Sequence, residues 1–153
     1  MNYLKTINGN LLDANEPYIL HQCNCVSENA KALAEQIFKK YPYSNTYSKR
    51  VHGIKSTYGI PGTIDICTDT NNKTIINAYA QIYPSTAKYD DTQHKRLTWF
   101  RECLDHVRHK NINNIAMPYN IGCGAAGGDW KQYYEILETF ANDNKIHITL
   151  YKL

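Results

Sequence analysis

Apolar residues along this chain alternate between two spacings, one typical of buried strands and one typical of amphipathic helices. Strands are predicted at residues 2–7, 18–23, 62–68, 74–80, 114–118 and 145–152. Helices are predicted from residue 30 to 41, from 91 or 92 to about 109, and from about 129 to 140. Such alternation predicts an α/β fold, with helices on both faces of a mostly parallel sheet.

Local signals mark where several of these elements begin and end. Pro42 ends the first predicted helix, and either Asp91 or Thr92 can cap the second. The turn 70–72 joins two neighbouring strands. Residues 43–60 are polar and rich in tyrosine, so they are expected to form a long loop with a short helix.

Composition excludes several classes of protein. The chain has 153 residues, 42% of them hydrophobic, and 17 Lys+Arg against 14 Asp+Glu give a net charge of +3. These values predict a single domain over residues 1–153, neither disordered nor held to nucleic acid by bulk charge. No run of 18 apolar residues exists, and the N-terminus lacks the apolar core of a signal peptide. The odd number of cysteines, five, and the missing export signal favour free thiols and a cytoplasmic location. No contact with a membrane is expected.

Ligands of such folds bind at the carboxyl ends of the strands, and two loops there stand out. One follows the strand that ends near Pro118, where residues 122–128 contain four glycines and two alanines. Their N–H groups can cradle a phosphate or diphosphate, although a plain turn before a helix cap at Asp129 would have the same composition. The segment has neither the Walker pattern nor the context of a dinucleotide-binding glycine motif.

The other loop follows the strand that ends near Cys23. Polar residues there, His21 and Asn24 among them, are costly to bury without partners or a ligand. His21 by itself is equally consistent with a hydrogen-bonded core histidine. The pair Cys23 and Cys25 lacks a second pair at zinc-finger spacing, so neither a metal nor another cofactor is predicted. Cys123 in the glycine-rich loop has no evident general base, which favours a packing role over a nucleophilic one.

These segments, in this order, resemble the macro domain family, whose members bind ADP-ribose. The resemblance rests on the segments Gly9-Asn10-Leu11-Leu12, His21-Gln22-Cys23-Asn24, Ile121-Gly122-Cys123-Gly124 and Ile148-Thr149-Leu150-Tyr151. It implies a three-layer α/β/α fold around a central mixed, mostly parallel sheet. The first-loop segment and the closing strand are most similar to the ADP-ribose 1″-phosphate phosphatases.

The resemblance also implies roles for single residues. His21 and Asn24 correspond to residues beside the distal ribose, and both are the implied catalytic residues. The implied substrate-binding residues are Asn10, Leu11, Asn24, Lys31, Ala32, Leu33, Ile121, Gly122, Cys123, Gly124, Ala125, Ala126, Gly127 and Tyr151. Among them, Asn10 would face the adenine amino group, and Tyr151 would either stack on the base or pack beside it.

Two departures from the family pattern bear on activity. Residues 30–32 read Ala-Lys-Ala where relatives are usually glycine-rich, and Lys31 would either pair with a phosphate or point to solvent. Relatives that remove ADP-ribose from protein glutamates use a lysine and an aspartate. Residues 77–81 contain no lysine, and the aspartate position is Ala126. A lysyl adduct is therefore not expected.

The resemblance implies hydrolysis of ADP-ribose 1″-phosphate to ADP-ribose and phosphate, with His21 as general acid or base. Asn24 would orient the ribose or the water, and the glycine-rich loop would stabilise the phosphate oxygens. Two alternatives remain open. One is a non-catalytic module that holds ADP-ribose or related NAD-derived nucleotides, and the other is a protein ADP-ribosyl hydrolase. The expected partners are thus ADP-ribose or its 1″-phosphate and ADP-ribosylated protein, without nucleic acid.

Overall fold

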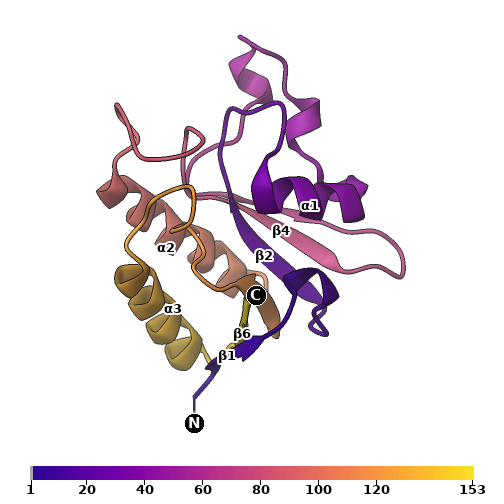
Figure 1. Cartoon of the computed structure of the whole chain (residues 1–153), viewed down its shortest axis with the longest axis vertical. Coiled ribbons are helices and arrows are strands. Elements are labelled where there is room, and N and C mark those ends of the chain that lie inside the picture. Colours follow the sequence, from indigo (N-terminus) through magenta and orange to yellow (C-terminus); the bar gives the residue numbers. More distant parts are fainter. Residues whose placement is uncertain (1) are drawn as a thin grey trace.

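A computed structural model describes residues 2–153, which form one six-stranded sheet and three α-helices (Figure 1). The strands are β1 (Leu4–Asn8), β2 (Tyr18–Cys23), β3 (Ile64–Cys67), β4 (Thr74–Tyr79), β5 (Ile115–Pro118) and β6 (Ile148–Lys152). The helices are α1 (Ala32–Lys40), α2 (Gln93–His109) and α3 (Trp130–Asn144). Within the described residues, no helix is long and apolar enough to cross a membrane.

The strands lie in the order β1-β6-β5-β2-β4-β3. All neighbours are parallel except β3, which forms an antiparallel hairpin with β4 at one edge. The sheet is therefore mixed and mostly parallel, as predicted. Parallel pairing of β2 with both β4 and β5 brings the carboxyl ends of these three strands to one edge.

Helix α1 covers one face of the sheet, and α2 and α3 cover the other (Figure 1). Successive residues of β2 alternate between these two layers. Ile19 belongs to the core under α1 with Ile37 and Phe38, whereas Leu20 belongs to the core under α2 and α3 with Phe100. The predicted three-layer α/β/α arrangement is confirmed.

Most predicted elements are present, with shifted ends. Thr92 caps α2 by accepting from the N–H of Lys95, so the cap is not Asp91. Helix α3 continues beyond Phe140 to Asn144 because Ala141 still faces the core, and the predicted end at 140 is wrong. The helix stops at Lys145, whose φ of 54° is left-handed, and β6 therefore starts only at 148. The segment 43–60 contains short 3-10 helices rather than one short helix.

Candidate functional site

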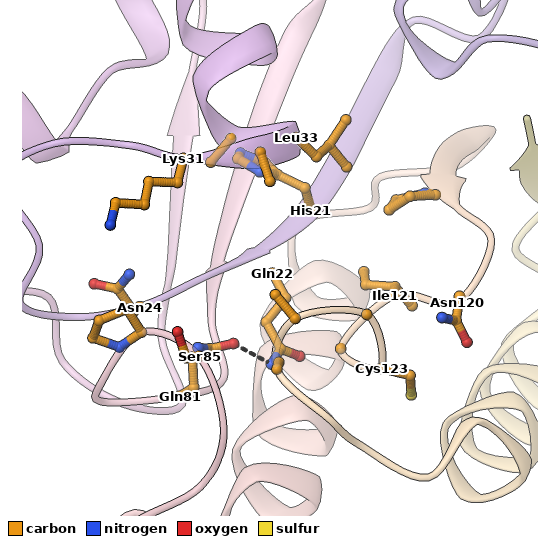
Figure 2. A pocket seen from close by; sticks show the side chains of 18 of the residues that line it. His21, Gln22, Asn24, Lys31, Leu33, Gln81, Ser85, Asn120, Ile121 and Cys123 are labelled. Carbon is orange, nitrogen blue, oxygen red and sulfur yellow. Dashed lines mark hydrogen bonds between the residues drawn. The ribbon is translucent and has the colours of Figure 1, made fainter.

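A cavity of about 510 Å³ opens at the carboxyl ends of β2, β4 and β5 (Figure 2). Its lining comes from the end of β2, the loop that follows it and the first turn of α1. The loop between β4 and α2, the end of β5 with the glycine-rich loop, and Tyr47 complete it. The lining residues are His21, Gln22, Asn24, Ser27, Asn29, Lys31, Ala32, Leu33, Ala34, Tyr47, Gln81, Pro84, Ser85, Pro118, Tyr119, Asn120, Ile121, Gly122, Cys123, Gly124, Ala125 and Ala126.

Most of the sequence-predicted site residues meet at this cavity. Those in its lining are His21, Asn24, Lys31, Ala32, Leu33, Ile121, Gly122, Cys123, Gly124, Ala125 and Ala126. The lining does not include the remaining four, Asn10, Leu11, Gly127 and Tyr151. The side-chain oxygen of Asn10 instead accepts from the N–H of Leu12, and the Tyr151 hydroxyl donates to Glu16.

The glycine-rich loop offers main-chain donors to the cavity. In residues 2–153, no hydrogen-bond acceptor is found for the N–H groups of Gly122, Gly124, Ala125 and Ala126. The loop reaches this shape because Gly122 has φ of 76° and lies directly over Tyr133, where an added Cβ would be 2.4 Å from the ring. The four residues also line the cavity, so their free N–H groups can serve as a cradle for anionic oxygen atoms.

The two helices beside the cavity differ at their N-termini. Asp129 caps α3, since its carboxylate accepts from the N–H of Lys131. The N-cap of α1 is Lys31, which makes no capping hydrogen bond with its side chain. Lys31, Ala32 and Leu33 all line the cavity, so it is the uncapped first turn of α1 that faces the ligand space. A helix N-terminus in this state favours an anion.

Ala32 begins α1 with φ of 53°, a left-handed conformation that glycine adopts without strain. We expect Ala32→Gly to raise the free energy of unfolding by about 0.5–1 kcal/mol, because relief of this strain exceeds the added entropy of the unfolded chain. Thermal unfolding of the variant against the wild type checks this. Ala34→Gly, within the same helix, is the control and should lower stability by about 0.5–1 kcal/mol. A loss of stability in both variants would contradict the strain at Ala32.

Asn24 is held rigidly with one half of its amide free. Its Oδ1 accepts from the N–H groups of Val26 and Ser27, and its own N–H donates to the Tyr47 hydroxyl. The hydrogen bonds of Asn24 in the described chain use its N–H and Oδ1 and not its Nδ2, and the residue lines the cavity although it is only 8% exposed. No enclosed side-chain nitrogen of the described chain lacks a partner, so Nδ2 is accessible. This Nδ2 is therefore available to donate to a ligand oxygen.

His21 lies at the inner end of the cavity, 1% exposed, and its ring packs edge-on against Phe38. Its Nε2 is 2.6 Å from Oδ1 of Asn77, whose Nδ2 donates to the carbonyl of Ser44. Asn77 Oδ1 must then be the acceptor, so the His21 proton is on Nε2. Burial lowers the pKa of His21 to about 4, against the opposing effect of the Asn77 hydrogen bond. The imidazole is thus neutral near pH 7.

This burial predicts a pH-dependent stability. The pKa of His21 falls from about 6.5 when unfolded to about 4 when folded, so between these values the unfolded chain binds a proton that the folded protein excludes. We expect the free energy of unfolding to decrease by about 1.4 kcal/mol per pH unit as the pH is lowered through this window. Denaturant titrations of the wild type and His21→Gln at several pH values measure it. The other five histidines are exposed and cancel in the comparison, and parallel pH profiles would contradict the prediction.

Two glutamines form the floor of the cavity (Figure 2). The amide nitrogen of Gln22 donates to Oε1 of Gln81 at 2.8 Å, and Gln22 Oε1 accepts from the Tyr133 hydroxyl. Gln81 in turn donates to the carbonyl of Tyr83. These bonds fix the direction of both amides, so the floor has a defined polarity before a ligand binds.

A buried ion pair connects two of the cavity walls. The Arg96 guanidinium makes two hydrogen bonds of 2.8 Å to Asp91, and both side chains are fully buried. Its remaining donors reach the carbonyls of Tyr83, Ser85 and Ala126. Burial by itself would raise the pKa of Asp91, but the hydrogen bonds from Arg96 and the main chain outweigh it and lower the pKa. Asp91 is therefore a structural carboxylate.

Cys123 is a poor nucleophile in this site. Burial raises the pKa of its thiol to about 12, and the nearby Asp129 carboxylate adds to the effect. The thiol therefore stays protonated near pH 7, and the packing role that the sequence favours is supported. Within residues 2–153, no three His, Cys, Asp or Glu side chains are grouped so as to hold a metal ion.

The charge of the lining has one sign. No aspartate or glutamate is among the lining residues, and Lys31 is their single lysine or arginine. In Figure 2, Lys31 and Asn24 lie on one side of the cavity, and Ile121 and Cys123 of the glycine-rich loop lie on the other. A cavity of this kind favours an anionic ligand with polar groups.

Sequence reasoning missed the loop after β4 and both buried arginines. The loop supplies Gln81, Pro84 and Ser85, and the rule that ligands bind at carboxyl strand ends would have found it. The segment 81–85 does not stand out in the sequence, because it contains neither a glycine nor a charged residue. Arg50 and Arg96 gave no such signal, because nothing local in the sequence shows that an arginine will be buried.

Comparison with known proteins agrees with this fold. The macro domain family model matches residues 20–137, and the chain belongs to the macro domain family. No curated protein matches the sequence.

Three solved structures share the fold. The macrodomain of Mycobacterium tuberculosis DarG is 23% identical with a TM-score of 0.74, over 99% of this chain and 98% of that one. A Bacteroides thetaiotaomicron protein of unknown function is 22% identical with a TM-score of 0.73, over 98% of both chains. Thermosipho africanus DarTG, solved in complex with ADP-ribose, is 14% identical with a TM-score of 0.69, over 97% of this chain and 41% of that one.

Proposed function

We propose that the cavity binds ADP-ribose, either free or attached to protein, and ADP-ribose 1″-phosphate. The observation that carries this proposal is a lining with free main-chain N–H groups on two opposing loops, one lysine and no carboxylate. Such a lining suits a ligand with several negative charges. Membership of the macro domain family supports the proposal, as does the T. africanus DarTG structure with bound ADP-ribose.

The shape of the cavity suggests how the ligand lies. The uncapped start of α1 and the glycine-rich loop can hold a diphosphate between them, and Asn24 can donate to the distal ribose. Asn10, Leu11 and Tyr151 are outside the lining, so contacts with them require an adenine that extends beyond the cavity.

Isothermal titration calorimetry with ADP-ribose tests binding. Gly124→Glu should weaken binding by about tenfold or more, because it adds a carboxylate to the cradle. The variant should fold normally, since a Cβ at Gly124 meets no atom within 4 Å. Thr98→Glu, on the exposed face of α2, adds the same charge away from the cavity and should bind like the wild type. Wild-type protein that binds no ADP-ribose would refute the proposal.

A second candidate function is hydrolysis of ADP-ribose 1″-phosphate. The free Nδ2 of Asn24, together with His21 in the lining, favours it. In this reaction water attacks phosphorus, the bond from phosphorus to the ribose oxygen breaks, and that oxygen takes up a proton. Because His21 is neutral with its proton on Nε2, it can accept a proton from water only through Nδ1. The neutral ring has no second proton to give to the leaving oxygen, because Nδ1 is unprotonated and the Nε2 proton is donated to Asn77.

Phosphorus NMR of ADP-ribose 1″-phosphate with the protein distinguishes the two functions. Growth of an inorganic phosphate signal with intact diphosphate signals would establish hydrolysis. Asn24→Ala and His21→Gln should then slow it. Shifted diphosphate signals without phosphate release would establish binding alone. Removal of ADP-ribose through a lysyl adduct is not proposed, since residues 77–81 contain no lysine and Ala126 replaces the aspartate.

A further inference from the structure

Arg50 is buried directly behind the first loop of the cavity. The residue is only 4% exposed. Its guanidinium stacks on the Tyr47 ring at 4.3 Å and lies 5.6 Å from the centre of the Tyr79 ring. Gly59 leaves room for it, since a Cβ there would be 3.2 Å from Nη2. The guanidinium therefore has a fixed place in the fold.

The hydrogen bonds of Arg50 all go to the loop that lines the cavity. Nη2 donates to the carbonyl of Asn24 at 2.8 Å, and Nη1 donates to the carbonyl of Ser27 at 2.9 Å and to Oδ1 of Asn24 at 3.4 Å. Both Asn24 and Ser27 line the cavity, as does Tyr47 under the guanidinium. Arg50 is thus separated from the ligand space by one layer of residues.

The two buried arginines differ in how their charge is balanced. Arg96 forms an ion pair with Asp91, whereas in the described chain Arg50 forms no ion pair. The carboxylate of Asp65 accepts a hydrogen bond from the Tyr79 hydroxyl and makes none with the Arg50 guanidinium. A buried charge without a counter-charge is costly to a fold, and the cost decreases when an anion binds nearby.

We propose that Arg50 acts as a fixed positive charge behind the cavity and gives the site a preference for the more negatively charged of two ligands. This proposal rests on the proposed function. ADP-ribose 1″-phosphate carries one more phosphate than ADP-ribose, at the ribose that Asn24 is expected to contact. Arg50 stabilises that extra charge without touching it and also positions Asn24. A positioning role alone would affect both ligands equally, so the ratio of their affinities isolates the charge.

The experiment compares the affinities of ADP-ribose and ADP-ribose 1″-phosphate by calorimetry at low and moderate salt. The titrations are done at low temperature, so that any hydrolysis of the 1″-phosphate is slow. Arg50→Gln should weaken the binding of ADP-ribose and should weaken that of the 1″-phosphate by a further factor of about three to ten. Arg50→Lys keeps the charge and should retain the wild-type ratio even where both affinities fall. Arg108→Gln removes an exposed arginine charge that pairs with Asp105 and should leave both affinities unchanged.

The outcomes separate the two proposals. If the wild type binds neither ligand, the proposed function fails and this inference fails with it. If the wild type binds both but Arg50→Gln weakens both by the same factor, only the inference on Arg50 is wrong. If Arg50→Gln does not fold, Lys31→Gln tests which charge causes the preference. This variant should fold, because Lys31 is exposed. A preference for the 1″-phosphate that persists without Lys31 supports Arg50, and a preference that disappears overturns it.

Discussion

Replacing Arg96 with methionine is expected to lower the free energy of unfolding by about 3–5 kcal/mol, since it leaves the buried Asp91 charge without its partner. Arg96 and Asp91 have no exposed surface, and the guanidinium uses all five N–H groups on Asp91 and three carbonyls. No other side chain offers five donors in this planar arrangement. Urea unfolding of the variant against the wild type measures the effect.

The exposed pair of Arg108 with Asp105 on the same helix is the matched control. Arg108→Met should cost less than about 1 kcal/mol, because water screens an exposed pair. Arg96→Met should also weaken ADP-ribose binding, since Ser85 and Ala126 line the cavity and are both held by Arg96. Equal losses of stability in the two variants would show that the buried pair does not hold the walls together.

Gly122→Ala is expected to have the second large effect, a loss of about 2–5 kcal/mol from left-handed strain and overpacking together. Its φ is 76°, and a Cβ would approach the Tyr133 ring to 2.4 Å. Tyr133 is fully buried and donates to Gln22, so moving the ring also disturbs the floor of the cavity. Thermal unfolding and calorimetry with ADP-ribose together follow both consequences.

Gly124→Ala, two residues along the same loop, is the control. Its φ is not left-handed, and a Cβ there meets nothing within 4 Å. We expect a change within about 0.5 kcal/mol, as for an ordinary exposed substitution. If Gly124→Ala were as damaging as Gly122→Ala, general flexibility of the loop rather than the contact with Tyr133 would be the cause.

The sequence predicted the elements well wherever a local signal acts within a few residues. The apolar run at 18–23 is β2, and Thr92 and Asp129 cap their helices through N–H groups two or three residues away. The glycine-rich loop could be recognised for the same reason, because its backbone freedom is a property of its own residues. The end of α3 was missed because it depends on Ala141 packing against the core, which the local pattern near Phe140 does not reveal.

The chemistry of the site was less predictable because it depends on partners far apart in the chain. His21 looked like a possible acid or base. Its proton is committed to Asn77, 56 residues away, and burial between layers lowers its pKa to about 4. Asp91 was one of two candidates for a helix cap, whereas it pairs with Arg96 inside the protein. Pairing and desolvation of this kind arise only when the strands have been placed side by side.

By itself, the sequence determined the order of strands and helices, their caps and turns, and the backbone freedom of residues 122–128. It did so because helix and strand periodicity, proline and glycine act locally. Only the tertiary structure decided which loops share one cavity and which charges are balanced. Parallel pairing of β2 with β4 brought Gln81 beside Gln22. Both Arg50 and Arg96 are buried, but within residues 2–153 only Arg96 of the two forms an ion pair. Burial and electrostatic balance are properties of a whole packed environment, and no short stretch of sequence contains them.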